Sequence, residues 1–364
     1  MISKPKQSNA IGTDYVKYYI LTGNDLKTFL LQYSAFPCVS QLLPLASSVT
    51  ANALFISHSV PFLPFYSFIP EILCKFAQKD SIMTKFLYND FSTFLRQHFN
   101  CKVQKISINA GFTCPNRDGT KGLGGCTYCN NQTFNPEYCK TEKTVREQLE
   151  EGRVFFSRKY PEMKYLAYFQ AYTNTYDELE ELKRKYEQAL EVEDVVGIVI
   201  GTRPDCMPDE LLNYLQELSK RVFLLVEYGI ESTDDVTLQR INRGHTYADT
   251  IDAVNRTVER DIYVGGHIIL GLPGESHEQI MKQATQLSRL PLTTLKLHQL
   301  QLIRGTKMAK EYMMNPELFH LYEVDEYIDL VIDYVERLRP DIILERFVSQ
   351  SPKELLIAPD WGLK

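Results

Sequence analysis

The feature that most constrains the fold is a repeated order of short apolar runs and helical segments between residues 103 and 338. Each run is rich in β-branched or aromatic residues, and a segment with helical spacing follows it. Strands that are apolar on both faces must be buried on both faces, so the order predicts an α/β fold with a parallel sheet covered by helices. The runs are VQKISIN at 103, YLAYFQA at 165, VVGIVIG at 195, VFLLVEYG at 222, VGGHIILG at 264 and TLKLHQL at 294.

Six such units favour a partial, TIM-like (β/α)6 barrel. Three of the helices are clear from the spacing of their apolar residues, at 177–190, 208–218 and 328–338, and Pro340 stops the last one. Chemistry in this architecture belongs at the carboxyl ends of the strands. A polar or glycine-rich segment follows each predicted strand. After the first strand comes a loop that contains cysteines, and the later strands are followed in order by QAYTNTYD, GTRPDC, EYGIES, GLPGES and HQLQLIRGT.

The first 82 residues differ from the rest. From Thr28 to Pro70 there is no Asp, Glu, Lys or Arg, although 24% of the chain is charged. Five prolines and several polar patches interrupt this stretch before about 20 apolar residues accumulate, which argues against a membrane-spanning helix. We expect residues 1–82 to be a poorly ordered N-terminal extension, or an upstream start that is not used, and the folded domain to begin at Met83.

Charge and cysteine usage narrow the functional class. A net charge of -6 argues against an indiscriminate nucleic-acid binder, which needs a positive field. The eight cysteines are scattered over a long chain whose start lacks the layout of a secretory signal. These features predict a cytoplasmic protein with reduced thiols, in which closely spaced cysteines indicate a metal.

Three cysteines, Cys114, Cys126 and Cys129, share one loop with four glycines in the spacing C-x11-C-x2-C. Three thiolates around an iron-sulfur cube leave one iron open to a small molecule, whereas structural zinc needs a fourth ligand, such as Cys139. The spacing favours iron-sulfur and leaves zinc as the alternative. Packing roles are expected for the remaining cysteines, Cys38, Cys74, Cys101, Cys139 and Cys206.

At this point the chain resembles a known family. From about Phe86 to its end it is similar to the YhcC-type radical S-adenosylmethionine (SAM) proteins, which are related to the radical SAM domain of the Elongator catalytic subunit. The resemblance implies a radical SAM core at 83–310 and a C-terminal helical extension at 311–364, which we expect to continue beyond LLIAPDWGLK. It rests on five blocks in order: KISINAGFTCPNRDG, YFQAYTNTY, GTRPDC, RINRGHTY and HIILGLPGE.

The resemblance implies a 4Fe-4S cluster on Cys114, Cys126 and Cys129, with the amino and carboxylate groups of SAM on the fourth iron. One electron, from a donor such as flavodoxin or ferredoxin, would then release a 5′-deoxyadenosyl radical. The Elongator likeness also implies RNA chemistry, at a wobble uridine of transfer RNA. The alternative is a non-catalytic iron-sulfur or zinc protein that senses redox state or docks a partner.

The resemblance also assigns residues to SAM. Tyr128 would lie beside the adenine, with packing under the loop as the alternative. Relatives grip the methionyl amino group with a glycine-glycine-glutamate stretch, which is absent here. The residues at that position are Gln170, Ala171, Tyr172 and Thr173, and the motif that lies against adenine corresponds to Gly271, Leu272 and Pro273.

Several charged residues complete the expected site. Glu227 is costly to bury alone, so a ribose hydroxyl or an ion pair with Arg203 is expected as its partner. Lys296 and His298 alternate on the sixth strand, so both can face the cavity. A carboxylate or phosphate could be held by Arg203, Arg240, Arg243 and His245, with a surface salt bridge as the alternative for Arg240.

Overall fold

The computed structural model describes residues 15–22, 25–32, 88–133, 135–157 and 162–362. The chain divides into two units, residues 1–87 and 88–364. In the first unit, β1 (Tyr15–Thr22) and β2 (Asp25–Gln32) form an antiparallel hairpin. The rest of the predicted extension lies outside the described residues, and its boundary at residue 82 stays a prediction.

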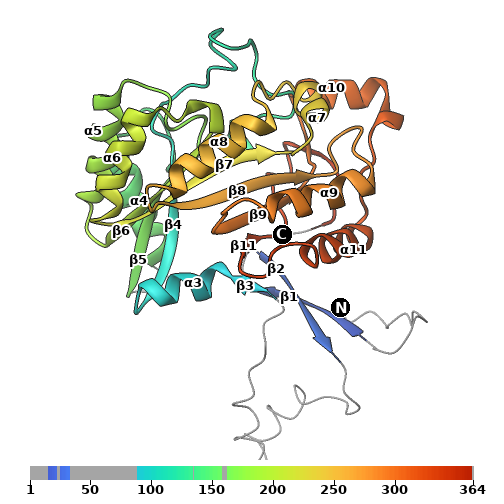
Figure 1. The fold of residues 1–364 in the computed structure, drawn as a ribbon, viewed down its shortest axis with the longest axis horizontal. Coiled ribbons are helices and arrows are strands. Elements are labelled where there is room, and N and C mark those ends of the chain that lie inside the picture. The colour runs from blue at the N-terminus through green and yellow to red at the C-terminus, as the bar shows by residue number, and fades with distance from the viewer. Residues whose placement is uncertain (1–14, 23–24, 33–87, 134, 158–161, 363–364) are drawn as a thin grey trace, which may run out of the picture. The chain divides into compact units, whose positions relative to one another are not determined.

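The second unit is built on one parallel sheet of eight strands that curls into a partial barrel (Figure 1). Every neighbouring pair in this sheet is parallel. In sheet order the strands are β3 (Asn89–Asp90), β11 (Ile343–Arg346), β9 (Thr294–Gln299), β8 (Tyr263–Leu270), β7 (Phe223–Glu231), β6 (Val195–Thr202), β5 (Met163–Phe169) and β4 (Lys102–Ile108).

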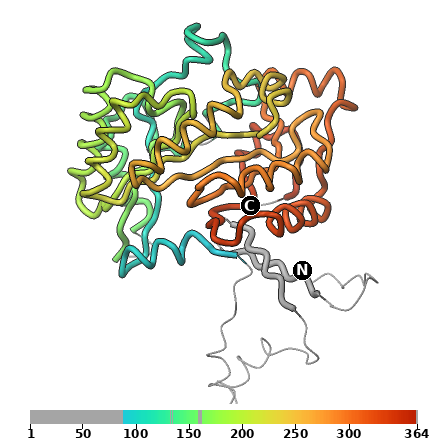
Figure 2. Tube along the Cα trace, viewed as in Figure 1, coloured from blue at the N-terminus to red at the C-terminus, as the bar shows by residue number. Residues whose placement is uncertain are grey.

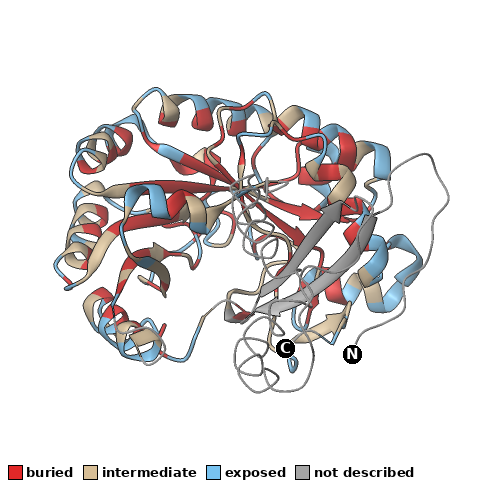
Figure 3. Cartoon of the chain, turned by 90° about the horizontal axis from the view of Figure 1, so that it is seen from below, coloured by how far each residue is buried: buried red, intermediate tan, exposed pale blue. Residues whose placement is uncertain are grey.

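Helices follow the strands and cover the outer face of the curled sheet, with their buried sides turned towards the strands (Figure 3). Figure 2 traces these units in chain order from β4 to β9. The helices are α3 (Phe91–His98), α4 (Val145–Ser157), α5 (Leu179–Leu190), α6 (Asp209–Ser219), α7 (Asp235–Arg240), α8 (Tyr247–Val258), α9 (His277–Leu287), α10 (Lys307–Met314) and α11 (Val324–Val335).

Local sequence explains these elements. The strands are buried along most of their length, as runs covered on both faces must be. Helix α8 begins at a capping box in which Thr246 and Asp249 satisfy each other's backbone amides, and α9 begins at the same device with Ser276 and Gln279. All six predicted strands and the three clearly predicted helices are present, so the α/β partial barrel is confirmed.

Two strands at one end of the sheet, the edge strand β3 and its neighbour β11, were not predicted. Strand β3 has two residues, and β11 reads ILER, with two charged residues in four. Such short polar runs carry no strand signal of their own. Beyond β11 the chain returns to the sheet: Gln299 bonds to the backbone of Ser349, and β10 (Leu302–Ile303) pairs with β12 (Leu356–Ala358). The C-terminal segment therefore closes over the carboxyl end of β9.

Candidate functional site

The three cysteines lie in the loop after β4, and backbone hydrogen bonds fold this loop on itself. The amide of Arg117 donates to the carbonyl of Cys114 at 2.8 Å, and the amide of Cys129 donates to that of Cys126 at 3.1 Å. Gly125 has a φ of +77°, which favours glycine, and a Cβ there would lie 2.8 Å from the Arg117 side chain. The loop is thus compact, and one of its glycines is required by space as well as by conformation.

All three cysteines line one cavity at the carboxyl ends of the parallel strands. Its volume is about 1280 Å³ with the open mouth included. Every strand from β5 to β9, and β11, contributes to the wall, as the fold class predicts for a site. Besides the cysteines, the wall includes Tyr168, Gln170, Thr202, Arg203, Glu227, Glu231, Arg243, His267, His298, Gln299, Arg346 and Ser349.

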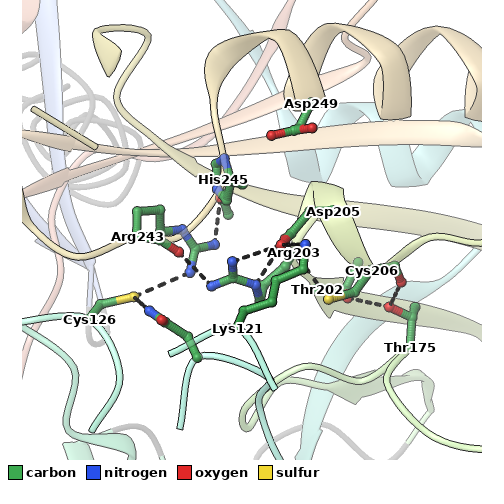
Figure 4. A network of polar contacts seen from close by, with 12 residues as sticks. Lys121, Cys126, Thr175, Thr202, Arg203, Asp205, Cys206, Arg243, His245 and Asp249 are labelled. Carbon is green, nitrogen blue, oxygen red and sulfur yellow. Dashed lines mark hydrogen bonds and ion pairs between the residues drawn. The ribbon is translucent and has the colours of Figure 1, made fainter. Parts of the chain in front are cut away.

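Two N–H groups approach the sulfur of Cys126. The side-chain amide of Asn116 and Nη1 of Arg243 each lie 3.6 Å from this Sγ (Figure 4). Arg117 donates to the carbonyl of Cys129 at 3.0 Å, which brings a second guanidinium to the same loop. Nε of Arg243 is buried and has no hydrogen-bond partner in the described part of the chain. Such donors favour a thiolate and any negatively charged cluster that it holds.

The arrangement of the sulfurs bears on the choice of metal. Within the described residues, no three Cys, His, Asp or Glu side chains are gathered closely enough to bind a single ion. Cys139, the expected fourth zinc ligand, contacts Asn135 and does not line the cavity. Mononuclear zinc needs four ligands around one point, whereas thiolates of a cubane bind different irons. Three cysteines that line one cavity suit a cubane, which would take one thiolate on each of three irons.

Arg203 lines the cavity but does not pair with Glu227. The ion-pair alternative was therefore wrong, and the ribose contact of Glu227 stays a prediction. The guanidinium is 2% exposed and grips Asp205 with two bonds, at 2.9 and 3.0 Å, while its Nη1 donates to the carbonyl of Arg243 at 2.7 Å (Figure 4). Burial opposes ionisation, but Arg203 lowers the pKa of Asp205 to about 2. The two residues follow β6 directly, and the short η2 turn (Pro204–Cys206) lets them face each other.

Glu227 instead lies between two lysines. Its oxygens accept bonds from Lys105 at 2.6 Å and from Lys296 at 2.7 Å. Burial opposes ionisation of Glu227, but the two ammonium groups outweigh it and hold the pKa of this carboxyl below its usual range. Glu227 still reaches the cavity wall. The ammonium group of Lys296 points to this ion pair and does not line the cavity. Of the two β9 residues that were predicted to face the cavity, only His298 lines it.

Glu231 was missed as an individual residue, although it lies in the EYGIES block. It ends β7 with a φ of +68°, where the register with β8 shifts, and a shift of this kind re-aims a side chain. Its carboxylate accepts from Nδ1 of His267 at 2.9 Å and lies 3.6 Å from Arg243. Despite burial, His267 and Arg243 lower the pKa of Glu231 to about 2. Only tertiary structure brings these three residues together.

The residues predicted to hold the methionyl end of SAM lie mostly at the cavity. Gln170, Tyr172 and Thr173 line it, and Ala171 is buried between them without lining it. Tyr172 has a φ of +63°, and the Arg117 guanidinium lies 5.8 Å from the centre of its ring. The peptide after β5 is therefore held in a conformation that non-glycine residues seldom adopt, as functional loops often are.

Of the residues predicted to contact adenine, only Tyr128 lines the cavity. Tyr128 lines the cavity and also packs against an apolar cluster that contains Leu272. Gly271, Leu272 and Pro273 do not line the cavity themselves. Gly271 has a φ of +87°, and a Cβ at this position would lie 2.9 Å from the ring of Tyr322. The glycine is thus needed for the turn and for close packing, which is the ordinary role of such a motif.

The other predicted residues have structural partners. Arg240 pairs with Glu311 at 2.8 Å on the surface, and Nε2 of His245 lies 3.3 Å from the carbonyl of Gly229. Burial, with the nearby charge of Arg243, lowers the pKa of His245 to about 4.

The remaining cysteines are mostly packed. Burial raises the pKa of the Cys139 and Cys206 thiols to about 12, in agreement with packing. Cys101 is only half-buried, contrary to expectation. Cys38 and Cys74 lie outside the described residues. No helix among the described residues is long and apolar enough to cross a membrane.

Comparison with known proteins shows the family of this chain. The radical SAM superfamily profile matches residues 110–285, and the radical SAM C-terminal domain profile matches residues 292–364. YtqA of Bacillus subtilis is 38% identical over 276 residues, which cover 76% of this chain and 85% of that protein. YhcC of Escherichia coli K12 is 34% identical over 276 residues, which cover 76% of this chain and 87% of that protein.

A solved structure supports the fold. The archaeal Elp3 of Methanocaldococcus infernus, with its N-terminus deleted, superimposes with a TM-score of 0.52 at 18% identity, covering 71% of this chain and 59% of that one. At this identity the likeness concerns the fold alone. The two profiles and the relatives identical at more than 30% show the family: this chain belongs to the radical SAM superfamily, in the group of YhcC and YtqA.

Proposed function

We propose that this protein is an enzyme that cleaves SAM reductively at a 4Fe-4S cluster held by Cys114, Cys126 and Cys129. One observation carries the proposal: these three thiols line the same cavity as the polar carboxyl ends of six parallel strands. A sensor or docking module would need the cysteine loop alone. Within its family, the bound cluster supplies one electron that splits the sulfonium of SAM and yields a 5′-deoxyadenosyl radical.

The chain's own residues would prepare this chemistry. Asn116 and Arg243 place N–H groups 3.6 Å from the Cys126 sulfur, and such groups stabilise negative charge on a thiolate-bound cluster. The bidentate pair of Arg203 with Asp205 holds the backbone carbonyl of Arg243 and so fixes that segment against the loop. These residues orient the cofactor and exclude water from it, which is the protein's share of such reactions.

SAM would occupy the cavity beside the loop. Gln170 and Thr173 line the wall after β5, in the place expected for the methionyl amino group, and Tyr128 offers a ring face for adenine. Glu227 would reach a ribose hydroxyl only from within its pair of lysines. The adenine motif would act only indirectly, by packing behind Tyr128, because none of its residues, Gly271, Leu272 and Pro273, lines the cavity.

Anaerobic reconstitution tests the proposal. The protein, loaded with iron and sulfide, is incubated with SAM and dithionite, and 5′-deoxyadenosine is measured by chromatography. We expect turnover that the Cys126→Ala variant lacks and the Cys206→Ala variant keeps, because Cys206 lies outside the cavity. A full cluster without 5′-deoxyadenosine above background would favour the non-catalytic sensor, and a zinc-loaded protein would exclude the cluster itself. Flavodoxin or ferredoxin is the proposed natural reductant.

We further propose a transfer RNA substrate. The support is a likeness to a tRNA uridine(34) acetyltransferase of Methanocaldococcus infernus, 28% identical over 148 residues, or 40% of this chain and 27% of that protein. Arg203 and Arg243, from the blocks shared with the Elongator family, are directed at Asp205 and Cys126, so they support the cofactor site more directly than RNA contact. Nucleoside mass spectrometry of transfer RNA from cells lacking the gene tests this part, and an unchanged wobble uridine would refute it.

A further inference from the structure

A buried group of charged side chains from β4, β7, β9 and β11 lies beneath the cavity wall and is here called the floor; of its four members only Glu227 lines the cavity itself. Lys105 contacts both Glu227, at 2.6 Å, and Glu345, at 2.5 Å. Lys296 contacts the same two carboxylates at 2.7 and 3.1 Å, and donates to the Tyr168 hydroxyl at 3.1 Å. Each side chain of this four-charge group is at most 13% exposed, so the group is a buried, neutral network of two lysines and two glutamates.

Arg346 adds a positive charge that has no ion-pair partner among the described residues. It follows Glu345 at the end of β11, where it is paired in register with Lys296, and it lines the cavity. Its Nε is buried without a hydrogen-bond partner, and the described part of the chain forms no ion pair with this guanidinium. With Arg346, the floor carries three positive and two negative charges. Arg346 as a whole is half-buried, but its Nε is out of contact with water and has no acceptor, so an anion that accepts from it would remove that cost.

His298 supplies a second unused donor beside it. The residue is 5% exposed and lines the cavity, and its Nε2 is buried without a partner in the described residues. Burial, His267 and the positive charge of Arg346 hold the pKa of His298 well below its usual range, so the ring is neutral. A neutral imidazole can carry its proton on Nε2 and donate it.

These two donors lie at the far end of a row of side chains that starts at the cysteine loop. Arg243 contacts the Cys126 sulfur and, at 3.6 Å, Glu231; Glu231 accepts from His267 at 2.9 Å. The rings of His267 and His298 are 4.0 Å apart. The row ends at His298 on β9, and Arg346 lies on the neighbouring strand β11. Both residues line the part of the cavity wall formed by these two strands, where a second molecule could bind beside SAM.

We infer that Arg346 and His298 form an anion subsite, which binds a carboxylate or phosphate group of the substrate at the floor of the cavity. The inference rests on the proposed function, since it assigns a substrate class to that same cavity. Arg346 offers a planar fork that suits either oxyanion, and His298 offers a single donor from the neighbouring strand. The second oxygen of Glu345 is also buried without a partner among the described residues, but Glu345 does not line the cavity and its charge is balanced by Lys105 and Lys296.

Binding of simple anions tests the subsite without knowledge of the substrate. The full-length, anaerobically purified protein is titrated with acetate or with inorganic phosphate at constant ionic strength, chloride being the reference. Thermal unfolding reports binding, because a ligand of the native state raises the melting temperature with its concentration. We expect saturable stabilisation by at least one of the two anions. Acetate alone would indicate a carboxylate, phosphate alone a phosphate, and both the shared oxyanion chemistry.

Matched variants locate the effect. Arg346→Met and His298→Leu should each raise the dissociation constant at least about tenfold, since each removes a buried donor to a charged group. Arg240→Met removes an exposed arginine that is paired with Glu311 and should leave binding unchanged. Arg346 has no partner to lose, so its variant should fold, and His298→Leu provides the same readout if it does not.

Three results would overturn the inference: no stabilisation of the wild-type protein, equal binding by Arg346→Met, or loss of anion binding when saturating SAM is present. The last would show that the donors hold the carboxylate of SAM. Failure of the proposed function has a different signature, namely no iron-sulfur cluster or no 5′-deoxyadenosine while the anion titration is unchanged.

Discussion

Replacing Asp205 with Asn should destabilise the protein more than any surface ion-pair variant. Asp205 and Arg203 are 3% and 2% exposed, so the pair is almost fully out of water. The variant leaves a buried guanidinium with one neutral acceptor in place of a carboxylate. Removing one partner of a buried ion pair lowers the free energy of unfolding by about 3–5 kcal/mol. Because the amide oxygen of Asn can still accept a hydrogen bond from Arg203, we expect a loss near the lower end of this range.

The depressed pKa of Asp205 gives a second value for the stability that this carboxylate contributes. The carboxyl is lowered from an ordinary value of 3.8 to about 2. This difference corresponds to about 2.5 kcal/mol of stability at neutral pH, in the same range as the first figure. Because the folded-state pKa is depressed, this stability is present above pH 3.8 and is lost as the pH falls towards 2.

Urea unfolding followed by far-UV circular dichroism under anaerobic conditions measures the loss. The matched control is Glu311→Gln, which breaks the half-exposed pair with Arg240 and should cost less than about 1 kcal/mol. Iron retention gives a functional readout, since Arg203 also holds the carbonyl of Arg243, whose side chain approaches Cys126. The reasoning is refuted if Asp205→Asn is no less stable than Glu311→Gln, or if its deficit persists unchanged at pH 3.

Replacing any one of the three loop cysteines with alanine should abolish iron binding and the brown colour, whereas Cys206→Ala should keep both. Iron content is measured in each variant, and a loop variant that still binds iron would contradict the proposed ligands. Burial raises the pKa of Glu275 to about 7 from 4.5, so its contribution to stability is present below pH 4.5 and is lost as the pH rises through 7. Glu275→Gln should therefore flatten the fall in stability across that window, and an unaltered pH profile would count against it. Gly125→Ala should lower the free energy of unfolding by more than the about 1–2 kcal/mol expected for an alanine in the left-handed region, because its Cβ would contact Arg117. Gly305→Ala is the control, because it has the same backbone strain but no atom near the added Cβ. Equal losses of stability in the two variants would refute the contact with Arg117.

Several features were predictable because they depend on short stretches of chain. The six central strands follow from runs of β-branched and aromatic residues, and the parallel order follows from their alternation with helices. The cysteine loop and the strand-end blocks were predictable as site segments, because parallel strands bring their carboxyl ends to one edge. Strands β3 and β11 were not predictable, since their two and four residues acquire strand geometry only through pairing of β11 with β9 and of β3 with β11.

Side-chain partners were the least predictable part. A ribose hydroxyl or Arg203 was expected as the partner of Glu227, and its ion pairs are instead with Lys105, 122 residues earlier, and Lys296, 69 residues later. Arg203 takes Asp205, two residues away. The motif at Gly271 stands behind the cavity wall, because a turn at the end of β8 carries it past the edge of the sheet.

By itself, therefore, the sequence determined the fold class, the family and the segments that form the site, because hydrophobic periodicity and motif spacing act over a few residues at a time. Tertiary structure alone decided which charges neutralise one another inside the barrel and which polar groups at the cavity wall, such as Nε of Arg346 and Nε2 of His298, have no partner among the described residues. The physical reason is that curling the sheet brings side chains from distant strands across a common interior, where burial makes every unpaired charge costly.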